Sequence, residues 1–168
     1  MGRATSAGPG FAIAEARDAA AVAACAALFR DYQRSLGISL DFQGFEAELA
    51  SLPGAYASPR GRLFLASHAG AAVGCVALRP REAHVCEMKR LFVRPEARGT
   101  GLGLALASAA IAAARGIGYR RMWLDTLPTM GPAQRMYEQL GFRDAAPYYE
   151  TPIAGTRFMA LDLTAAGS

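Results

Sequence analysis

The pattern of apolar and polar positions along the chain predicts a series of short strands. Apolar residues alternate with small or polar ones, or form short continuous runs bounded by turn residues, as is typical of half-buried and buried strands. Six segments fit this description: residues 11–17, the two arms of a hairpin within 59–80, and residues 84–93, 120–126 and 156–163.

The strand over residues 84–93 is the longest of the six and ends just before Pro95. Successive side chains of a strand point to opposite faces of its sheet. Strict alternation therefore predicts one face made of Glu87, Lys89, Leu91 and Val93, and an opposite face made of Cys86, Met88, Arg90 and Phe92.

Four other segments have apolar residues at helical spacing. Asp18 is a suitable N-cap for the first of these helices, which we expect to end at Gly37. A shorter helix is predicted within residues 41–54, and an alanine-rich helix within 101–115. The last, within 131–142, has Pro132 in its first turn and Gly141 just after its end.

The order of these elements predicts a single domain of mixed α/β class. Strands and helices alternate irregularly, and 168 residues fit one hydrophobic core. We place the domain at residues 11–164, and we interpret residues 1–10 as a flexible N-terminal tail because they are rich in Gly, Ser and Pro.

Composition narrows the range of partners. The formal charge is +4, and all of the basic residues except Lys89 are arginines, which suit phosphate and carboxylate recognition. The arginines are scattered along the chain, which favours a small anionic ligand and argues against nucleic acid. No apolar run of membrane-spanning length occurs, so we expect no membrane partner.

The cysteines and histidines do not have the spacing of a metal site or a disulfide framework. No two of Cys25, Cys75 and Cys86 have the short spacing of a metal-binding or disulfide motif, and His68 and His84 lie apart from them in the sequence. We therefore expect no metal and interpret the cysteines as buried thiols of a cytoplasmic protein.

The most informative stretch is the turn "RGTGLG", residues 98–103, which joins the 84–93 strand to the alanine-rich helix. Free N–H groups at a helix N-terminus bind phosphate without a charged side chain. A Walker loop is excluded because no Gly-Lys-Ser/Thr ending is present. A dinucleotide fingerprint is disfavoured because Leu104 stands at the position of its third glycine.

The turn follows a third pattern: arginine or glutamine, two residues, glycine, one residue, and then glycine or alanine. With the preceding "MKRLFVRPEA" strand and the downstream "YEQLGF" helix, the chain resembles the GNAT superfamily of acyl-CoA-dependent N-acetyltransferases. The resemblance extends over about residues 11–163 in element order and is specific over about 85–143. It implies a mixed central sheet of about six or seven strands with four helices, splayed between the fourth and fifth strands.

The resemblance also implies acetyl-CoA as co-substrate, with no metal. Its pyrophosphate is expected on the glycine turn, and its pantetheine arm beside the preceding strand that ends at Val93. The implied coenzyme-binding residues are Leu91, Phe92, Val93, Arg98, Gly99, Thr100, Gly101, Leu102, Gly103 and Ala133. Many relatives have an asparagine where this chain has Met130, which leaves one coenzyme hydrogen bond without its usual partner.

Three residues match catalytic positions of the family. Tyr137 is the candidate general acid for the leaving thiolate, with packing as the alternative. Glu87 and Asp125 are alternative general bases, and either could instead be a solvated carboxylate at a strand end. Cys86 is interpreted as packing, since direct acetyl transfer needs no covalent nucleophile.

The acceptor is expected to be a small-molecule amine or an amino-acid-like molecule, bound by residues 30–45 and 145–158, where Tyr32, Tyr148 and Tyr149 stand. A non-catalytic acyl-CoA-binding module and an NAD-binding enzyme remain alternatives, and a homodimer is an open possibility for the assembly.

Overall fold

The computed structural model describes residues 5–6, 10–41 and 44–165. One eight-stranded sheet forms the centre, in the order β1-β2-β3-β4-β5-β6-β8-β7. The strands are β1 (Thr5–Ser6), β2 (Phe11–Glu15), β3 (Arg62–His68), β4 (Ala71–Glu82), β5 (Val85–Val93), β6 (Arg121–Thr126), β7 (Arg143–Asp144) and β8 (Arg157–Asp162). The predicted mixed α/β class and the order of the elements are confirmed.

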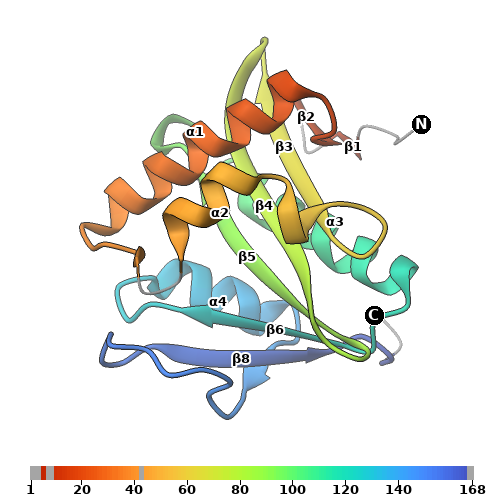
Figure 1. The fold of residues 1–168 in the computed structure, drawn as a ribbon, viewed down its shortest axis with the longest axis vertical. Helices are drawn as coiled ribbons and strands as arrows, with labels where there is room; N and C mark the ends of the chain where they lie inside the picture. Colours follow the sequence, from red (N-terminus) through yellow and green to blue (C-terminus); the bar gives the residue numbers. More distant parts are fainter. Residues whose placement is uncertain (1–4, 7–9, 42–43, 166–168) are drawn as a thin grey trace.

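Four α-helices flank the sheet, two on each face (Figure 1). They are α1 (Ala19–Leu36), α2 (Phe45–Ser51), α3 (Leu102–Ile117) and α4 (Gly131–Gln139), with short 3₁₀ turns at Gly54–Tyr56 and Pro95–Ala97. Helices α1 and α2 pack on one face of the sheet with Phe29, Phe45 and Leu63. Helices α3 and α4 pack on the other with Leu106, Met122 and Phe142.

The predicted helix boundaries have the expected capping. The Asp18 carboxylate accepts a hydrogen bond from the N–H of Ala21 at 2.7 Å, which is an N-cap contribution of about 1 kcal/mol. Gly37 ends α1 in the left-handed conformation, with φ of 66°. Gly141 follows α4 in the same way, with φ of 104°.

Within the predicted N-terminal tail, Thr5 and Ser6 form a strand. They pair with Ile13 and Ala12 at the edge of the sheet, as β1. Residues 1–4 and 7–9 lie outside the described residues.

The predicted faces of β5 are wrong beyond Lys89. Its pairing with β4 shifts between Cys75 and Ala77, and Arg90 has a φ of 59°, so the strand carries a bulge. The bulge turns Arg90 onto the α2 side, where it stacks on Phe45. Leu91 and Val93 consequently pack with the α3 core, together with Cys86 and Met88, while Phe92 packs on the α1 side.

Candidate active site

Strands β5 and β6 separate partway along their length, as predicted. They are parallel partners only from Val85–Arg121 to Glu87–Trp123, although β5 continues to Val93 and β6 to Thr126. Beyond Glu87 the two strands diverge, and the sheet opens into a slot between its two halves.

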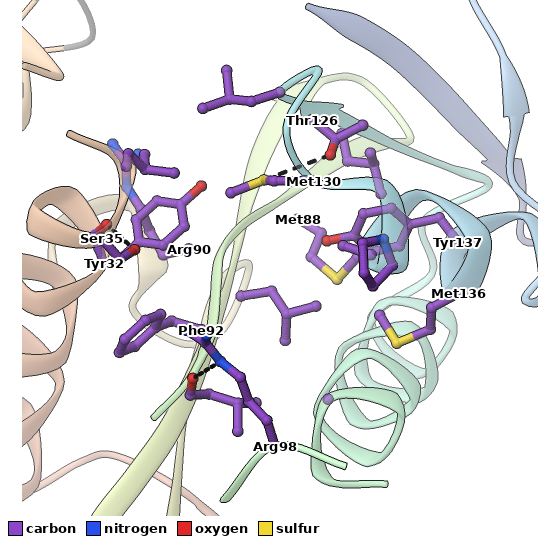
Figure 2. Close-up of a pocket in the computed structure, with 18 of the residues that line it drawn as sticks. Tyr32, Ser35, Met88, Arg90, Phe92, Arg98, Thr126, Met130, Met136 and Tyr137 are labelled. Atoms are coloured by element: carbon purple, nitrogen blue, oxygen red, sulfur yellow. Dashed lines mark hydrogen bonds between the residues drawn. The ribbon is translucent and has the colours of Figure 1, made fainter. Parts of the chain in front are cut away.

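A cavity of about 790 Å³ occupies this slot. The ends of β5 and α1 form one wall, the glycine turn and the start of α3 form the floor, and β6 with α4 forms the opposite wall (Figure 2). Tyr32, Arg90 and Phe92 lie on one side of the opening in this view, and Met130, Met136 and Tyr137 lie on the other.

The glycine turn opens onto the cavity through its backbone. Gly99 and Gly101 have φ of 77° and 84°, a region that other residues rarely adopt, and an added Cβ at either would meet nothing within 4 Å. Helix α3 begins at Leu102, and no side chain of the described residues caps its N-terminus. This end of the cavity therefore suits an anion.

Most of the coenzyme-binding residues implied by the resemblance line the cavity. Leu91, Phe92, Val93, Arg98, Gly99, Gly101, Leu102, Gly103 and Ala133 do so. Thr100 is not among the lining residues, and its hydroxyl donates to the Ala97 carbonyl at 2.6 Å. Arg98 donates from Nε to the Val93 carbonyl at 3.1 Å, which ties the turn to the end of β5.

Tyr137 lies on the cavity wall formed by α4. It is 7% exposed, and its ring packs edge-on against Phe142 with the centroids 5.7 Å apart. Its hydroxyl makes no hydrogen bond to the residues that the structure describes. Burial raises the pKa of the Tyr137 phenol above its usual value, so the hydroxyl stays protonated at neutral pH.

The two candidate carboxylates differ in their access to the cavity. Asp125 lines it, and its side chain is 11% exposed. Glu87 is fully buried and is not a lining residue, and its Oε1 accepts from Arg79 Nε at 2.8 Å. Neither is the solvated strand-end carboxylate that the sequence left open.

Each of these carboxylates also accepts a hydrogen bond from a tyrosine of the segment between β7 and β8. Tyr148 donates to Glu87 Oε2, and Tyr149 donates to Asp125 Oδ2 at 2.7 Å. Tyr148 stacks on Trp123 of β6 with the centroids 4.9 Å apart. Sequence reasoning placed this tyrosine pair near the acceptor and missed its contact with the carboxylates, since neither spacing nor composition indicates it.

Lys89 was not predicted as a site residue, yet it lines the cavity. Its Nζ lies 3.6 Å from Asp125 Oδ1 and 3.9 Å from Glu87 Oε2. The Glu-x-Lys spacing in β5 was the available signal, because residues two apart share one face of a strand.

Two residues singled out in the sequence have structural contacts. Cys86 is fully buried, its thiol lies 3.6 Å from the Arg121 carbonyl, and burial raises its pKa to about 12, which agrees with packing. Met130 lines the cavity, and its sulfur accepts from the Thr126 hydroxyl at 3.7 Å. The usual asparagine position is thus occupied by a thioether.

Of the tyrosines expected near the acceptor, Tyr32 lines the cavity, and Tyr148 and Tyr149 do not. Arg157, within the expected segment 145–158, is not a lining residue either. Arg157 is paired with Asp144 and Glu138 near the β7 edge of the sheet.

Among the described helices, none is long and apolar enough to cross a membrane.

Comparison with known proteins agrees with this geometry. The acetyltransferase (GNAT) family model matches residues 22–142. An uncharacterized N-acetyltransferase of Schizosaccharomyces pombe is 41% identical over 139 residues, which cover 82% of this chain and 85% of that protein. One from Escherichia coli is 30% identical over 125 residues, covering 71% and 74%.

A crystal structure of an acetyltransferase from Streptococcus agalactiae shares the fold. Its TM-score is 0.77 at 22% identity, and the alignment covers 92% of this chain and 99% of that one. The family match, these relatives, the splayed sheet and the glycine turn agree, and the chain belongs to the GNAT family of acetyltransferases.

Proposed function

We propose that this N-acetyltransferase moves an acetyl group from acetyl-CoA to the primary amine of a small molecule, by direct attack. The observation that carries the proposal is the cavity of the splay, which brings the glycine turn, Asp125 and Tyr137 into one enclosure. The cavity thus offers an anion site, a carboxylate that can accept a proton and a phenol that can donate one, and acetyl transfer can use all three.

The donor would bind along the lower part of the cavity. Its pyrophosphate would accept hydrogen bonds from the N–H groups of residues 99–103, where the α3 dipole favours negative charge. Its pantetheine amides would lie beside the end of β5, whose edge toward β6 is open beyond Glu87.

The chemistry balances with two protein groups. The amine lone pair attacks the thioester carbonyl carbon, a C–N bond forms, and the C–S bond breaks. Asp125 accepts the proton that the amine loses, directly or through water, and Tyr137 donates a proton to the departing thiolate. We assign the base to Asp125 and not to Glu87, because Asp125 lines the cavity and Glu87 is enclosed by Arg79 and Tyr148.

The cavity lining supports a small acceptor with few charges. Tyr32, Leu36, Leu40, Leu127 and Met130 provide its largely apolar upper walls. Among the described lining residues Asp125 is the one carboxylate, whereas several ammonium groups would need several carboxylates. This composition favours a monoamine or an amino-acid-like molecule over a polyamine.

A panel of amines with free CoA as the readout tests the proposal. Arylalkylamines, amino acids, a polyamine, an aminoglycoside and a peptide N-terminus would each be assayed with acetyl-CoA. We expect CoA release with one of the first two classes. Binding of acetyl-CoA with no release across the panel would instead indicate a non-catalytic acyl-CoA-binding module.

A further inference from the structure

We propose that Lys89, the only lysine of the chain, is a positioning residue for the transfer: its ammonium spans the apex of the splay and holds the Asp125 carboxylate in place at the cavity wall. This inference rests on the proposed function. It assigns a role to a residue that neither the glycine turn nor the family match indicates.

Register places the Lys89–Asp125 pair at the point where the sheet opens. The last ladder pair between β5 and β6 is Glu87–Trp123, and Lys89 and Asp125 each lie two residues further along their strands. They are therefore the next residues on the same face. The ion pair between Lys89 and Asp125, with Nζ and Oδ1 3.6 Å apart, therefore lies just beyond the last main-chain pairing of β5 and β6.

Both oxygens of Asp125 are held by the protein. Lys89 lies beside Oδ1, and the Tyr149 hydroxyl donates to Oδ2 at 2.7 Å. A carboxylate fixed at both oxygens has a defined orientation, which proton transfer to a positioned group requires. Lys89 is fixed in turn by Glu87 on its other side, with Nζ and Oε2 3.9 Å apart.

Charge balance explains why a cation is kept at this depth. Arg79 and Lys89 carry two positive charges, and Glu87 and Asp125 carry two negative ones, so the four groups are neutral together. Removing the Lys89 ammonium would leave buried carboxylates with too few partners, which is costly.

The choice of lysine is itself informative. Lysine and arginine number eighteen in the chain, and every one but Lys89 is arginine. An ammonium is a compact charge that can approach carboxylates from two strands, whereas a guanidinium is a wide planar fork. The single lysine lies at a buried position, with 6% side-chain exposure, between carboxylates of two strands, where a compact cation fits better than a guanidinium.

Ionisable groups of several elements surround the pair. They are Arg79 of β4, Glu87 and Arg90 of β5, Glu48 of α2 through Arg90, Tyr32 of α1, Tyr137 of α4, and Tyr148 and Tyr149 of the segment before β8. Burial lowers the pKa of the Lys89 ammonium, and Asp125 and Glu87 oppose this effect. Loss of either carboxylate should lower that pKa further.

The single lysine permits a direct measurement. Protein labelled with ¹³C and ¹⁵N in lysine alone gives one lysine side-chain signal by NMR, and its chemical shift reports the titration of Lys89. We expect Asp125→Asn to lower the midpoint by about one pH unit or more, as loss of a close opposite charge does. Asp144→Asn is the matched control, because Asp144 is exposed and pairs with Arg157. A midpoint that Asp125→Asn leaves at the wild-type value would overturn the pairing.

Kinetics separate positioning from a structural role. For Lys89→Met we expect kcat/KM at neutral pH to fall roughly 10- to 100-fold. The acidic limb of the pH profile of kcat/KM should move to higher pH, and the affinity for acetyl-CoA should stay unchanged. Lys89→Arg should restore part of the activity. If Lys89→Met lowered kcat/KM by the same factor at every pH and left the acidic limb of the pH profile at its wild-type position, the proposal would be contradicted.

The two proposals fail in different ways. Wild-type protein that releases no CoA with any amine contradicts the acetyl transfer, and with it the positioning role. If the wild-type protein is active but the titration midpoint of Lys89 is the same in Asp125→Asn as in the wild type, only the Lys89 proposal is contradicted.

Discussion

At the scale of single residues, environment separates candidates that the sequence treats as equal. Glu87 and Asp125 are both strand carboxylates beside Lys89, but Asp125 alone of the two lines the cavity. Tyr137 also lines the cavity, whereas Tyr119, a buried tyrosine that no motif singled out, is not a lining residue and donates its hydroxyl to the Arg60 carbonyl at 2.8 Å. A role in proton transfer therefore belongs to Asp125 and Tyr137 in our proposal.

Tyr137→Phe should lower kcat roughly 100-fold while acetyl-CoA binding stays within about twofold, because the substitution removes one proton donor and keeps the ring packed. Steady-state kinetics and isothermal titration calorimetry measure the two quantities. Tyr119→Phe is the matched control: it loses one hydrogen bond, about 1 kcal/mol of stability, and should keep kcat. An unchanged kcat in Tyr137→Phe would remove this residue from the mechanism.

The resemblance to the family indicated that Tyr137 and the glycine turn belong to one site, because its motifs are local stretches of the chain, and both line one cavity. The contacts of the candidate residues could not be predicted in this way. The hydrogen bonds from Tyr148 and Tyr149 join segments more than twenty residues apart in the chain, so no local pattern encodes them. Buried ion pairs such as Lys89–Asp125 likewise arise from strand register across the sheet.

At the scale of elements, local sequence signals predicted the ends of the helices, but a bulge in β5 changed which of its side chains share a face. Caps and periodicity predicted α1 and α4 well, since Asp18, Gly37 and Gly141 act on their own chain neighbours. The bulge at Arg90 was missed, because it depends on the pairing of β5 with β4 and is not visible as a glycine or proline. It moved Leu91 and Val93 to the opposite face.

Gly103→Leu should weaken acetyl-CoA binding about tenfold without lowering stability. Gly103 lies in α3 and lines the cavity, and an added Cβ would stand 3.9 Å from both Val93 and Met136. The motif admits alanine here, whereas the longer leucine side chain would occupy part of the slot. Calorimetric titration and thermal unfolding would measure the two effects.

Gly116→Leu is the matched control in the same helix. An added Cβ at Gly116 meets nothing within 4 Å, and Gly116 is not a lining residue of the cavity. Leucine there should raise stability by about 0.4–1 kcal/mol through helix propensity and leave binding unchanged. Equal acetyl-CoA affinities in the two variants would contradict placement of the coenzyme against Gly103.

At the scale of the whole molecule, the splay divides the sheet into two parts with few direct ties. Strands β1 to β5 form one part and β6, β8 and β7 the other, and three ladder pairs join them. The α3 and α4 side of the core and the Lys89–Asp125 pair add to this connection. A ligand lying in the slot would contact both parts at once.

Acetyl-CoA should therefore raise the melting temperature in a concentration-dependent way. Ligand at 100 times its Kd adds about 2.7 kcal/mol to the free energy of unfolding, which corresponds to roughly 5–10 °C for a domain of this size. NAD and NADP serve as controls, since they share the pyrophosphate but lack the pantetheine arm that would lie along β5. Thermal-shift curves for the three ligands measure this, and stabilisation by NAD alone would mean that the glycine turn binds a dinucleotide and that the donor is wrongly assigned.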